Sequence, residues 1–139
     1  MRRPLALLAL EHLEPFIRQS GADLILPVPL HRRRLRSRGF NQALLLAELF
    51  SQNCHLPLDR HNLRRVRWTE PQVNLAAGQR RDNVKGAFAV THAERLHGRR
   101  LLLVDDVCTT GSTVEECAVI LKKAGAVDVT VVTVARAVV

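Results

Sequence analysis

Apolar positions along the chain recur at spacings that suit buried strands in some stretches and helices in others. The clearest succession comes late in the sequence: an apolar run at 100–104, a helical spacing over 113–124 that stops at Gly125, and a β-branched run at 127–134. Two strands joined by a helix within about 35 residues form a βαβ unit, which favours parallel strands. The pattern therefore predicts an α/β fold with a mainly parallel, twisted sheet flanked by helices.

Weaker patterns precede this unit and predict the rest of the architecture. The first is a helix over 4–19, with Pro15 as a kink or a break. The others are a strand at 24–28, a helix through about Cys54 capped by Asn41 or its neighbour, a strand at 63–67, a polar loop at 69–74, a short helix capped by Asn74 and a strand at 87–90. Because 139 residues suit one hydrophobic core, we expect a single domain over 1–139, with an N-terminal helix at 1–20 and a core at 21–137.

Net charge and mean hydropathy indicate which classes of partner this chain can bind. The chain carries 21 basic and 13 acidic residues, a formal net charge of +8, and a mean hydropathy of −0.01. The hydropathy argues against a membrane protein or a membrane partner, and the excess of arginine favours polyanions, since guanidinium groups match the geometry of phosphate. Charge alone leaves two kinds of ligand open, a nucleic acid and a small phosphorylated molecule.

Cysteine spacing and the N-terminal residues indicate a cytoplasmic protein. Cys54, Cys108 and Cys117 lie far apart and form no CxxC pair, so neither a disulfide framework nor a zinc site is expected. The stretch at 1–15 begins with basic and apolar residues, but Glu11 and other polar residues interrupt it. We interpret it as an amphipathic helix and not as a signal peptide.

A hydroxyl-rich loop joins the apolar run at 101–104 to the helix that follows. Free backbone N–H groups and the positive end of the helix dipole gather at such a junction, and Gly111 lets the backbone approach a ligand closely. A phosphate monoester suits this site, which comprises Thr109, Thr110, Gly111, Ser112 and Thr113. The alternative is helix capping alone, because the S/T-x-x-E capping box occurs twice, as Ser112 with Glu115 and as Thr113 with Glu116.

Two adjacent aspartates, Asp105 and Asp106, stand a few residues before this loop. Carboxylates do not bind phosphate, but they can accept hydrogen bonds from vicinal hydroxyls or hold Mg²⁺ directly or through water. A diol-binding acid pair beside a phosphate pocket describes a site for a ribose 5-phosphate. A solvated acidic loop is the alternative. Neither GxxxxGK[ST] nor GxGxxG occurs, so no P-loop or dinucleotide-binding site is indicated.

The stretch VDDVCTTGST, residues 104–113, resembles the motif with which type I phosphoribosyltransferases bind 5-phosphoribosyl 1-pyrophosphate (PRPP). The resemblance implies that Asp105 and Asp106 hold the ribose hydroxyls and Mg²⁺, and that the loop at 109–113 holds the 5′-phosphate. It also implies the type I phosphoribosyltransferase fold, in which a hood region selects the acceptor. Little of this chain is left over for a hood, so we expect a reduced one.

A second distinctive stretch, PVPLHRRRLRSRGFNQA at 27–43, contains five arginines between residues 32 and 38. On composition alone such a run indicates a solvated or nucleic-acid-facing surface, although its donors could also neutralise a pyrophosphate. Its flanking residues, with the later pattern QVNLAAGQRRDNVKGAF at 72–88, resemble the ComF/GntX family, whose members are similar to phosphoribosyltransferases and are associated with DNA uptake or gluconate utilisation. The resemblance covers roughly residues 20–137.

The resemblance to ComF-like proteins implies further roles. Leu30, His31 and Arg32 would lie in a pyrophosphate-binding loop after the first core strand. Residues 68–84 would close over the site, and Arg80 would reach the leaving group, which makes it a candidate catalytic residue beside the acid pair. Many ComF-like proteins also carry an N-terminal four-cysteine zinc module, whose ligands are absent from this sequence.

These patterns support a Mg²⁺-dependent phosphoribosyltransferase-like protein that binds PRPP and displaces pyrophosphate with an unidentified small-molecule acceptor. The alternative is a non-catalytic PRPP- or nucleotide-binding protein with an accessory or regulatory role in competence and DNA uptake. A third hypothesis assigns the arginine-rich surface to single-stranded DNA or to a competence protein. The shortage of aromatic residues counts against DNA as the principal ligand. A homodimer remains open.

Overall fold

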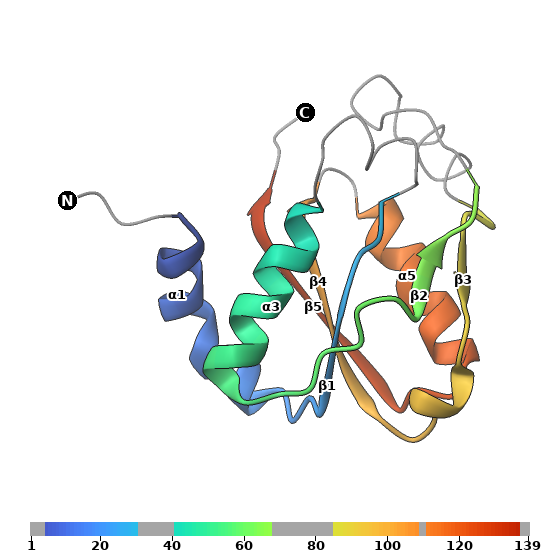
Figure 1. The fold of residues 1–139 in the computed structure, drawn as a ribbon, viewed down its shortest axis with the longest axis horizontal. Coiled ribbons are helices and arrows are strands. Elements are labelled where there is room, and N and C mark those ends of the chain that lie inside the picture. The colour runs from blue at the N-terminus through green and yellow to red at the C-terminus, as the bar shows by residue number, and fades with distance from the viewer. Residues whose placement is uncertain (1–4, 31–40, 68–84, 109–110, 137–139) are drawn as a thin grey trace.

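The computed structural model describes residues 5–30, 41–67, 85–108 and 111–136 (Figure 1). The elements follow one another as α1 (Leu5–Gln19), β1 (Leu24–Pro27), α3 (Gln42–Cys54), β2 (Leu63–Arg65), β3 (Phe88–Val90), a 3₁₀ turn (Ala93–Arg95), β4 (Arg100–Cys108), α5 (Ser112–Lys123) and β5 (Asp128–Arg136). A parallel three-stranded sheet with the order β1-β4-β5 forms the centre, and β2 pairs with β3 in a separate antiparallel ribbon. The predicted α/β fold with parallel strands is confirmed.

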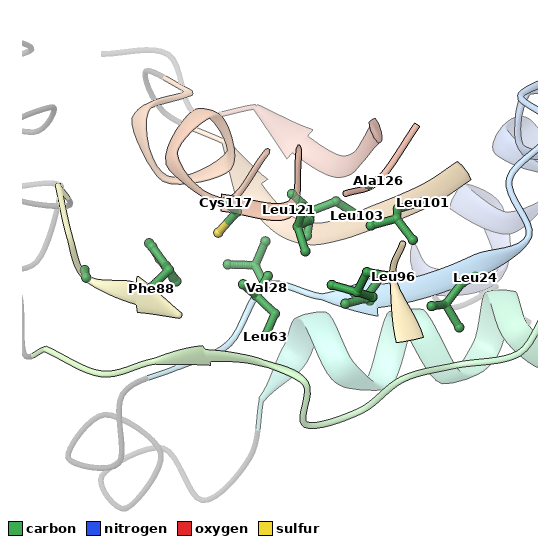
Figure 2. Packing of buried hydrophobic residues seen from close by; sticks show 12 residues of the cluster. Leu24, Val28, Leu63, Phe88, Leu96, Leu101, Leu103, Cys117, Leu121 and Ala126 are labelled. Carbon is green, nitrogen blue, oxygen red and sulfur yellow. The ribbon is translucent and has the colours of Figure 1, made fainter. Parts of the chain in front are cut away.

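Both faces of the parallel sheet are covered, and its central strand is therefore apolar on both sides. On one face Leu101 and Leu103 of β4 pack in a buried cluster with side chains of β1, the β2–β3 ribbon and α5, including Leu121 (Figure 2). On the other face Leu102 and Val104 pack against buried side chains of α1 and α3. Burial on both faces explains why this strand reads as a continuous apolar run and not as an alternating one.

Strand β4 is longer than the apolar run predicts. That run ends at Val104, but β4 stays paired with β5 beyond it, with Asp105 opposite Thr133 and Cys108 opposite Arg136. Backbone pairing with β5 continues the strand where the apolar side chains end. The acid pair therefore lies on the last part of a strand, and its interpretation as a solvated loop is wrong.

Helix α1 passes through Pro15 without ending, so this proline does not break the helix. Proline removes one backbone donor within a helix. Leu10 and Ile17 are both buried and belong to the cluster on the sheet, and they hold the helix in place on either side of Pro15. The polar loop predicted at 69–74 and the short helix predicted at Asn74 fall outside the described residues. None of the helices in the described part of the chain is long and apolar enough to cross a lipid bilayer.

Candidate functional site

The carboxyl ends of β1 and β4 and the N-terminus of α5 meet at one end of the parallel sheet (Figure 1). Pro27 lies opposite Val104 in the strand register, and the Val28 N–H donates to the Val104 carbonyl at 2.8 Å. The chain that leaves β1 toward Leu30 therefore starts beside the two aspartates that follow Val104. Ligands of open parallel sheets bind at this end.

Asn41 sets the position of α3 relative to this end of the sheet. Its side-chain oxygen accepts hydrogen bonds from the N–H groups of Ala43 (3.0 Å) and Leu44 (3.4 Å), which makes it the N-cap of the helix. Its Nδ2 group donates to the Val28 carbonyl at 3.3 Å. The predicted cap is confirmed, and it joins the start of α3 to the end of β1 on either side of the arginine-rich stretch.

Asp105 is partly buried on β4. Burial, followed by hydrogen bonding to the Asp106 side chain and the charge of Asp106, raises the pKa of its carboxyl to about 7, against opposing effects of the Asp106 N–H and the Arg65 charge. The Asp106 N–H donates to Asp105 Oδ1 at 2.9 Å. A cation or a pair of hydroxyl donors that stabilises both carboxylates would therefore release a proton near neutral pH.

Helix α5 begins directly after Gly111, whose backbone is left-handed with a φ of +86°. That conformation is ordinary for glycine and strained for other residues. A Cβ atom added at Gly111 would meet no heavy atom of the described residues within 4 Å. The first N–H groups of a helix lack helical carbonyl partners and form an anion-binding position there.

The hydroxyl side chains at the start of α5 do not form the capping boxes that the sequence allows. Gly111 occupies the N-cap position, and no side chain caps the helix there. Ser112 is the first helical residue and is buried. Glu116 Oε1 accepts a hydrogen bond from the Gly86 N–H at 3.3 Å, and so it joins α5 to the chain just before β3. The interpretation of this motif as capping alone is wrong.

Arg65 of β2 lies near the site, although the sequence pattern does not reveal it. Its guanidinium carbon is 4.7 Å from the centroid of the Phe88 ring, and its charge lowers the pKa of Asp105. Side chains of β2 alternate in exposure: Leu63 is buried, Arg64 is exposed and Arg65 is partly buried. The available signal was this alternation, which puts one arginine of LRR on the same side as a core leucine.

The thiols of Cys54 and Cys117 are packing groups. Both are free and buried, and burial raises the pKa of each. A raised pKa keeps a thiol protonated and therefore a poor nucleophile. A covalent reaction through either of these cysteines is disfavoured.

The predicted site residues divide into two groups. Those described at the carboxyl end of the sheet are Leu30, Asp105, Asp106, Gly111, Ser112 and Thr113. Those that lie outside the described residues are His31, Arg32, Arg80, Thr109 and Thr110.

The acid pair is the part of this site that suits a metal ion. Within the described ranges, no three His, Cys, Asp or Glu side chains are grouped to hold one. Mg²⁺ does not require such a cage, because it binds through one or two carboxylates and completes its shell with water and substrate phosphates. Asp105 and Asp106 therefore fit Mg²⁺ together with a phosphorylated ligand.

The fold matches that of a known class of enzyme structures. The purine phosphoribosyltransferase from Pyrococcus horikoshii Ot3 is similar over 95% of this chain and 73% of its own, with a TM-score of 0.64 and 20% sequence identity. The fold is thus that of the type I phosphoribosyltransferases, with the acid pair and the start of α5 at the carboxyl end of its sheet.

Comparison with relatives in sequence identifies the family within this fold class. The family model of the phosphoribosyl transferase domain matches residues 36–138. Competence protein F from Haemophilus influenzae is 40% identical over 116 residues, which cover 83% of this chain and 51% of that protein. DNA utilization protein YhgH from Escherichia coli (strain K12) is 43% identical over 109 residues, which cover 78% and 47%. The chain belongs to the phosphoribosyl transferase domain family, in its ComF-like branch, and spans about half the length of these relatives.

Proposed function

We propose that this chain binds PRPP and, with Mg²⁺, transfers its phosphoribosyl group to a small-molecule acceptor. One observation carries the proposal: the acid pair on the last part of β4 is followed, a few residues later, by Gly111 in a left-handed conformation at the start of α5. Groups that bind a diol thus stand beside groups that bind a phosphate. Membership of the phosphoribosyl transferase domain family supports the same assignment.

The acid pair and the helix start would hold the ribose 5-phosphate half of PRPP. Asp105 and Asp106 would accept hydrogen bonds from the ribose hydroxyls. The 5′-phosphate would accept them from N–H groups at the start of α5 and from the hydroxyl side chains at 109–113. Arg65 keeps a positive charge near Asp105, which favours the ionised carboxylate that the diol and Mg²⁺ require.

The pyrophosphate half would lie toward the chain that leaves β1. Leu30, His31 and Arg32 would surround it on that side, and Arg80 would approach it from residues 68–84. Mg²⁺, when bound, would neutralise charge on the departing phosphates. These residues would bind and orient the leaving group and keep water away from it.

The reaction would be a displacement at C1′ of the ribose. The bond from C1′ to the pyrophosphate oxygen breaks, pyrophosphate leaves with the electron pair, and a lone pair of the acceptor forms the new bond to C1′. Positive charge builds at C1′ and the ring oxygen while negative charge grows on the leaving group. The chain needs no covalent nucleophile for this step, in agreement with the buried, protonated thiols of Cys54 and Cys117.

Calorimetric titration with PRPP, with and without Mg²⁺, tests the binding half of the proposal. We expect saturable binding that Mg²⁺ strengthens. The double variant Asp105→Asn, Asp106→Asn should lose this binding while keeping its circular dichroism spectrum. Unchanged PRPP affinity in the folded double variant would remove the assignment.

Binding without turnover is the second candidate function. The curated relatives are called competence and DNA utilization proteins, names that refer to no transfer reaction. Pyrophosphate release from PRPP across a panel of bases and amines separates the two functions. Tight PRPP binding with no release would favour an accessory or regulatory role in competence, with a competence protein as partner. A single-stranded DNA role would show instead as DNA affinity that falls steeply with salt.

A further inference from the structure

A cavity of about 290 Å³ lies at the opposite end of the parallel sheet from the acid pair. Leu24 is the first residue of β1 and Arg99 directly precedes β4, which places the cavity at the amino ends of the strands. Because a strand rises about 3.3 Å per residue, Arg99, one residue before β4, is about 20 Å from Asp105 along the direction of the strand. The cavity is lined by Leu24, Pro57, Leu58, Asp59, Arg95 and Arg99.

One wall of the cavity is attached to the edge of β1. The Ile25 N–H donates to the Pro57 carbonyl, and the Asp59 N–H donates to the Ile25 carbonyl, each at 2.9 Å. Leu58 thereby forms a parallel bridge with Ile25. The apolar floor of the cavity, Leu24 with Pro57 and Leu58, is held by backbone hydrogen bonds.

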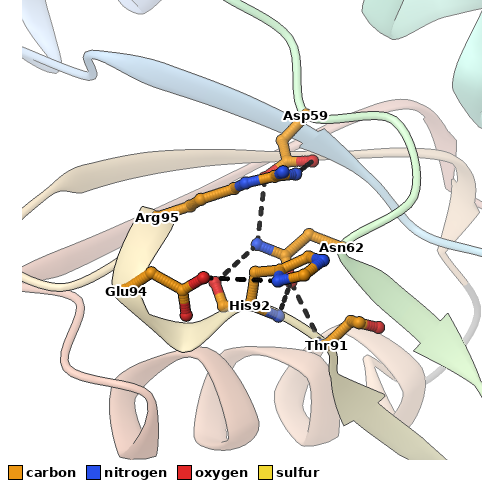
Figure 3. Close-up of polar contacts among 6 residues, drawn as sticks. All are labelled: Asp59, Asn62, Thr91, His92, Glu94 and Arg95. Carbon is orange, nitrogen blue, oxygen red and sulfur yellow. Dashed lines mark hydrogen bonds and ion pairs between the residues drawn. The ribbon is translucent and has the colours of Figure 1, made fainter.

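Asn62 fixes the polar part of the same wall (Figure 3). Its side chain is 1% exposed, and its Nδ2 group donates to Asp59 Oδ2 and to the His92 carbonyl, both at 2.9 Å. Its Oδ1 atom accepts hydrogen bonds from the N–H groups of Thr91 (3.1 Å) and His92 (2.7 Å). Asp59 and the turn that precedes Arg95 are therefore held together before any ligand arrives.

The guanidinium groups of Arg95 and Arg99 at this cavity have N–H donors available to a ligand. Arg95 Nη1 lies 3.9 Å from Asp59 Oδ1, at the limit of an ion pair, and the Arg95 side chain is 58% exposed. Asp59 already accepts a hydrogen bond from Asn62, so it does not saturate Arg95. Arg99 is exposed, and it forms no ion pair with any residue in the described ranges. Both arginines can bind an anion without losing a strong partner.

We propose that this cavity binds a small organic anion, with an apolar body on Leu24, Pro57 and Leu58 and a carboxylate or phosphate between Arg95 and Arg99. Both parts of such a ligand are needed. Exposed guanidinium groups alone bind simple anions weakly in water, and the open cavity buries limited apolar area. The site is separate from the proposed PRPP site and does not depend on it.

Chemical-shift titrations of the ¹⁵N-labelled chain with benzoate and phenyl phosphate test this proposal. One or both should shift the backbone amides of Leu58, Asp59 and 95–99 in a saturable way. Acetate, inorganic phosphate and neutral benzamide should bind at least about tenfold more weakly, because each lacks one of the two required parts. Comparing the affinities of benzoate and phenyl phosphate shows whether the cavity prefers a carboxylate or a phosphate.

Arginine variants locate the binding within the molecule. Arg99→Ala and Arg95→Ala should each weaken binding at least about fivefold. Arg64→Ala is the matched control, since Arg64 is exposed and does not line the cavity. The double variant Asp105→Asn, Asp106→Asn should bind the probes as the unsubstituted chain does, whatever its affinity for PRPP. The proposal would be overturned if benzamide bound as tightly as benzoate, or if the probes shifted only amides at the other end of the sheet or did not saturate. Equal losses of probe affinity in Arg64→Ala and Arg99→Ala would also overturn it.

Discussion

The carboxyl of Asp105 and the backbone of Asp106 are joined by a hydrogen bond, with the Asp106 N–H 2.9 Å from Asp105 Oδ1. Burial, aided by Asp106, raises the pKa of Asp105 to about 7. Two neighbouring acids on a partly buried strand end oppose folding when both are ionised. Binding of the proposed ligand through both carboxylates would offset this cost in stability.

The stability of the chain should therefore depend on pH through Asp105. Its folded-state pKa lies above the ordinary value of an aspartate, so the folded chain binds more protons than the unfolded chain between about pH 4 and pH 7. The free energy of unfolding should fall as the pH rises through this window. Asp105→Asn removes the ionisation and should stabilise the chain above pH 7 by up to about 4 kcal/mol.

Urea unfolding of both proteins from pH 4 to pH 8 measures this difference. The curve of the Asn variant should be flatter than that of the unsubstituted chain between about pH 4 and pH 7. Parallel curves would show that Asp105 does not retain its proton.

A comparison of Gly111 with Gly98 separates an effect on ligand binding from an effect of backbone strain on stability. Gly111 and Gly98 have φ values of +86° and +75°, and a Cβ atom at either would meet no heavy atom within 4 Å in the part of the chain that the structure describes. Alanine at either position should cost about 1 kcal/mol of stability, because both backbones are left-handed. Only Gly111→Ala places a methyl group beside the proposed phosphate site, so it alone should weaken PRPP binding, by at least about tenfold.

Thermal or urea unfolding and PRPP calorimetry on both glycine variants provide the comparison. Similar stability losses with PRPP affinity lost only at Gly111 are the expected result. A PRPP affinity that Gly111→Ala leaves intact, or that Gly98→Ala lowers equally, would argue against phosphate binding at the start of α5.

The effect of the Arg65 charge on the pKa of Asp105 should be measurable. Arg65→Met removes the positive charge and keeps an apolar stem against Phe88, so the pKa of Asp105 should rise above its value of about 7. Arg64→Met, on the same strand but exposed, should have a smaller effect. A ¹³C NMR titration of the Asp105 carboxyl in the two variants measures both shifts. Equal pKa values of Asp105 in the Arg65→Met and Arg64→Met variants would show that Arg65 does not act on Asp105.

Asn62 should be the more sensitive of two asparagines to substitution. Asn62→Ala removes a buried side chain that accepts hydrogen bonds from the Thr91 and His92 N–H groups and donates to the Asp59 carboxylate and the His92 carbonyl, and it should cost about 3 kcal/mol. Asn53 is exposed and donates one side-chain hydrogen bond to the Leu49 carbonyl, so Asn53→Ala should cost less than about 0.5 kcal/mol. Urea unfolding of both variants tests the difference, and losses of similar size would contradict it.

Much of the fold could be predicted because its signals are local. The strand, helix and strand between residues 100 and 136 each bury one kind of surface, and their spacing leaves a parallel βαβ unit as the simplest arrangement. The Asn41 cap follows from its side chain and the next helical turn alone. The end of β4 was missed because pairing with β5, and not the apolar pattern, carries that strand through the acid pair.

By itself the sequence determined the parallel α/β architecture, the order of acid pair, glycine and helix start, and the family, because each depends on residues close together along the chain. Only the tertiary structure decided that burial raises the pKa of Asp105 to about 7, that the charge of Arg65 opposes this shift, and that Arg95 and Arg99 share a cavity with Leu24. Burial and electrostatic interactions depend on distance in space, and packing sets those distances between residues far apart in sequence.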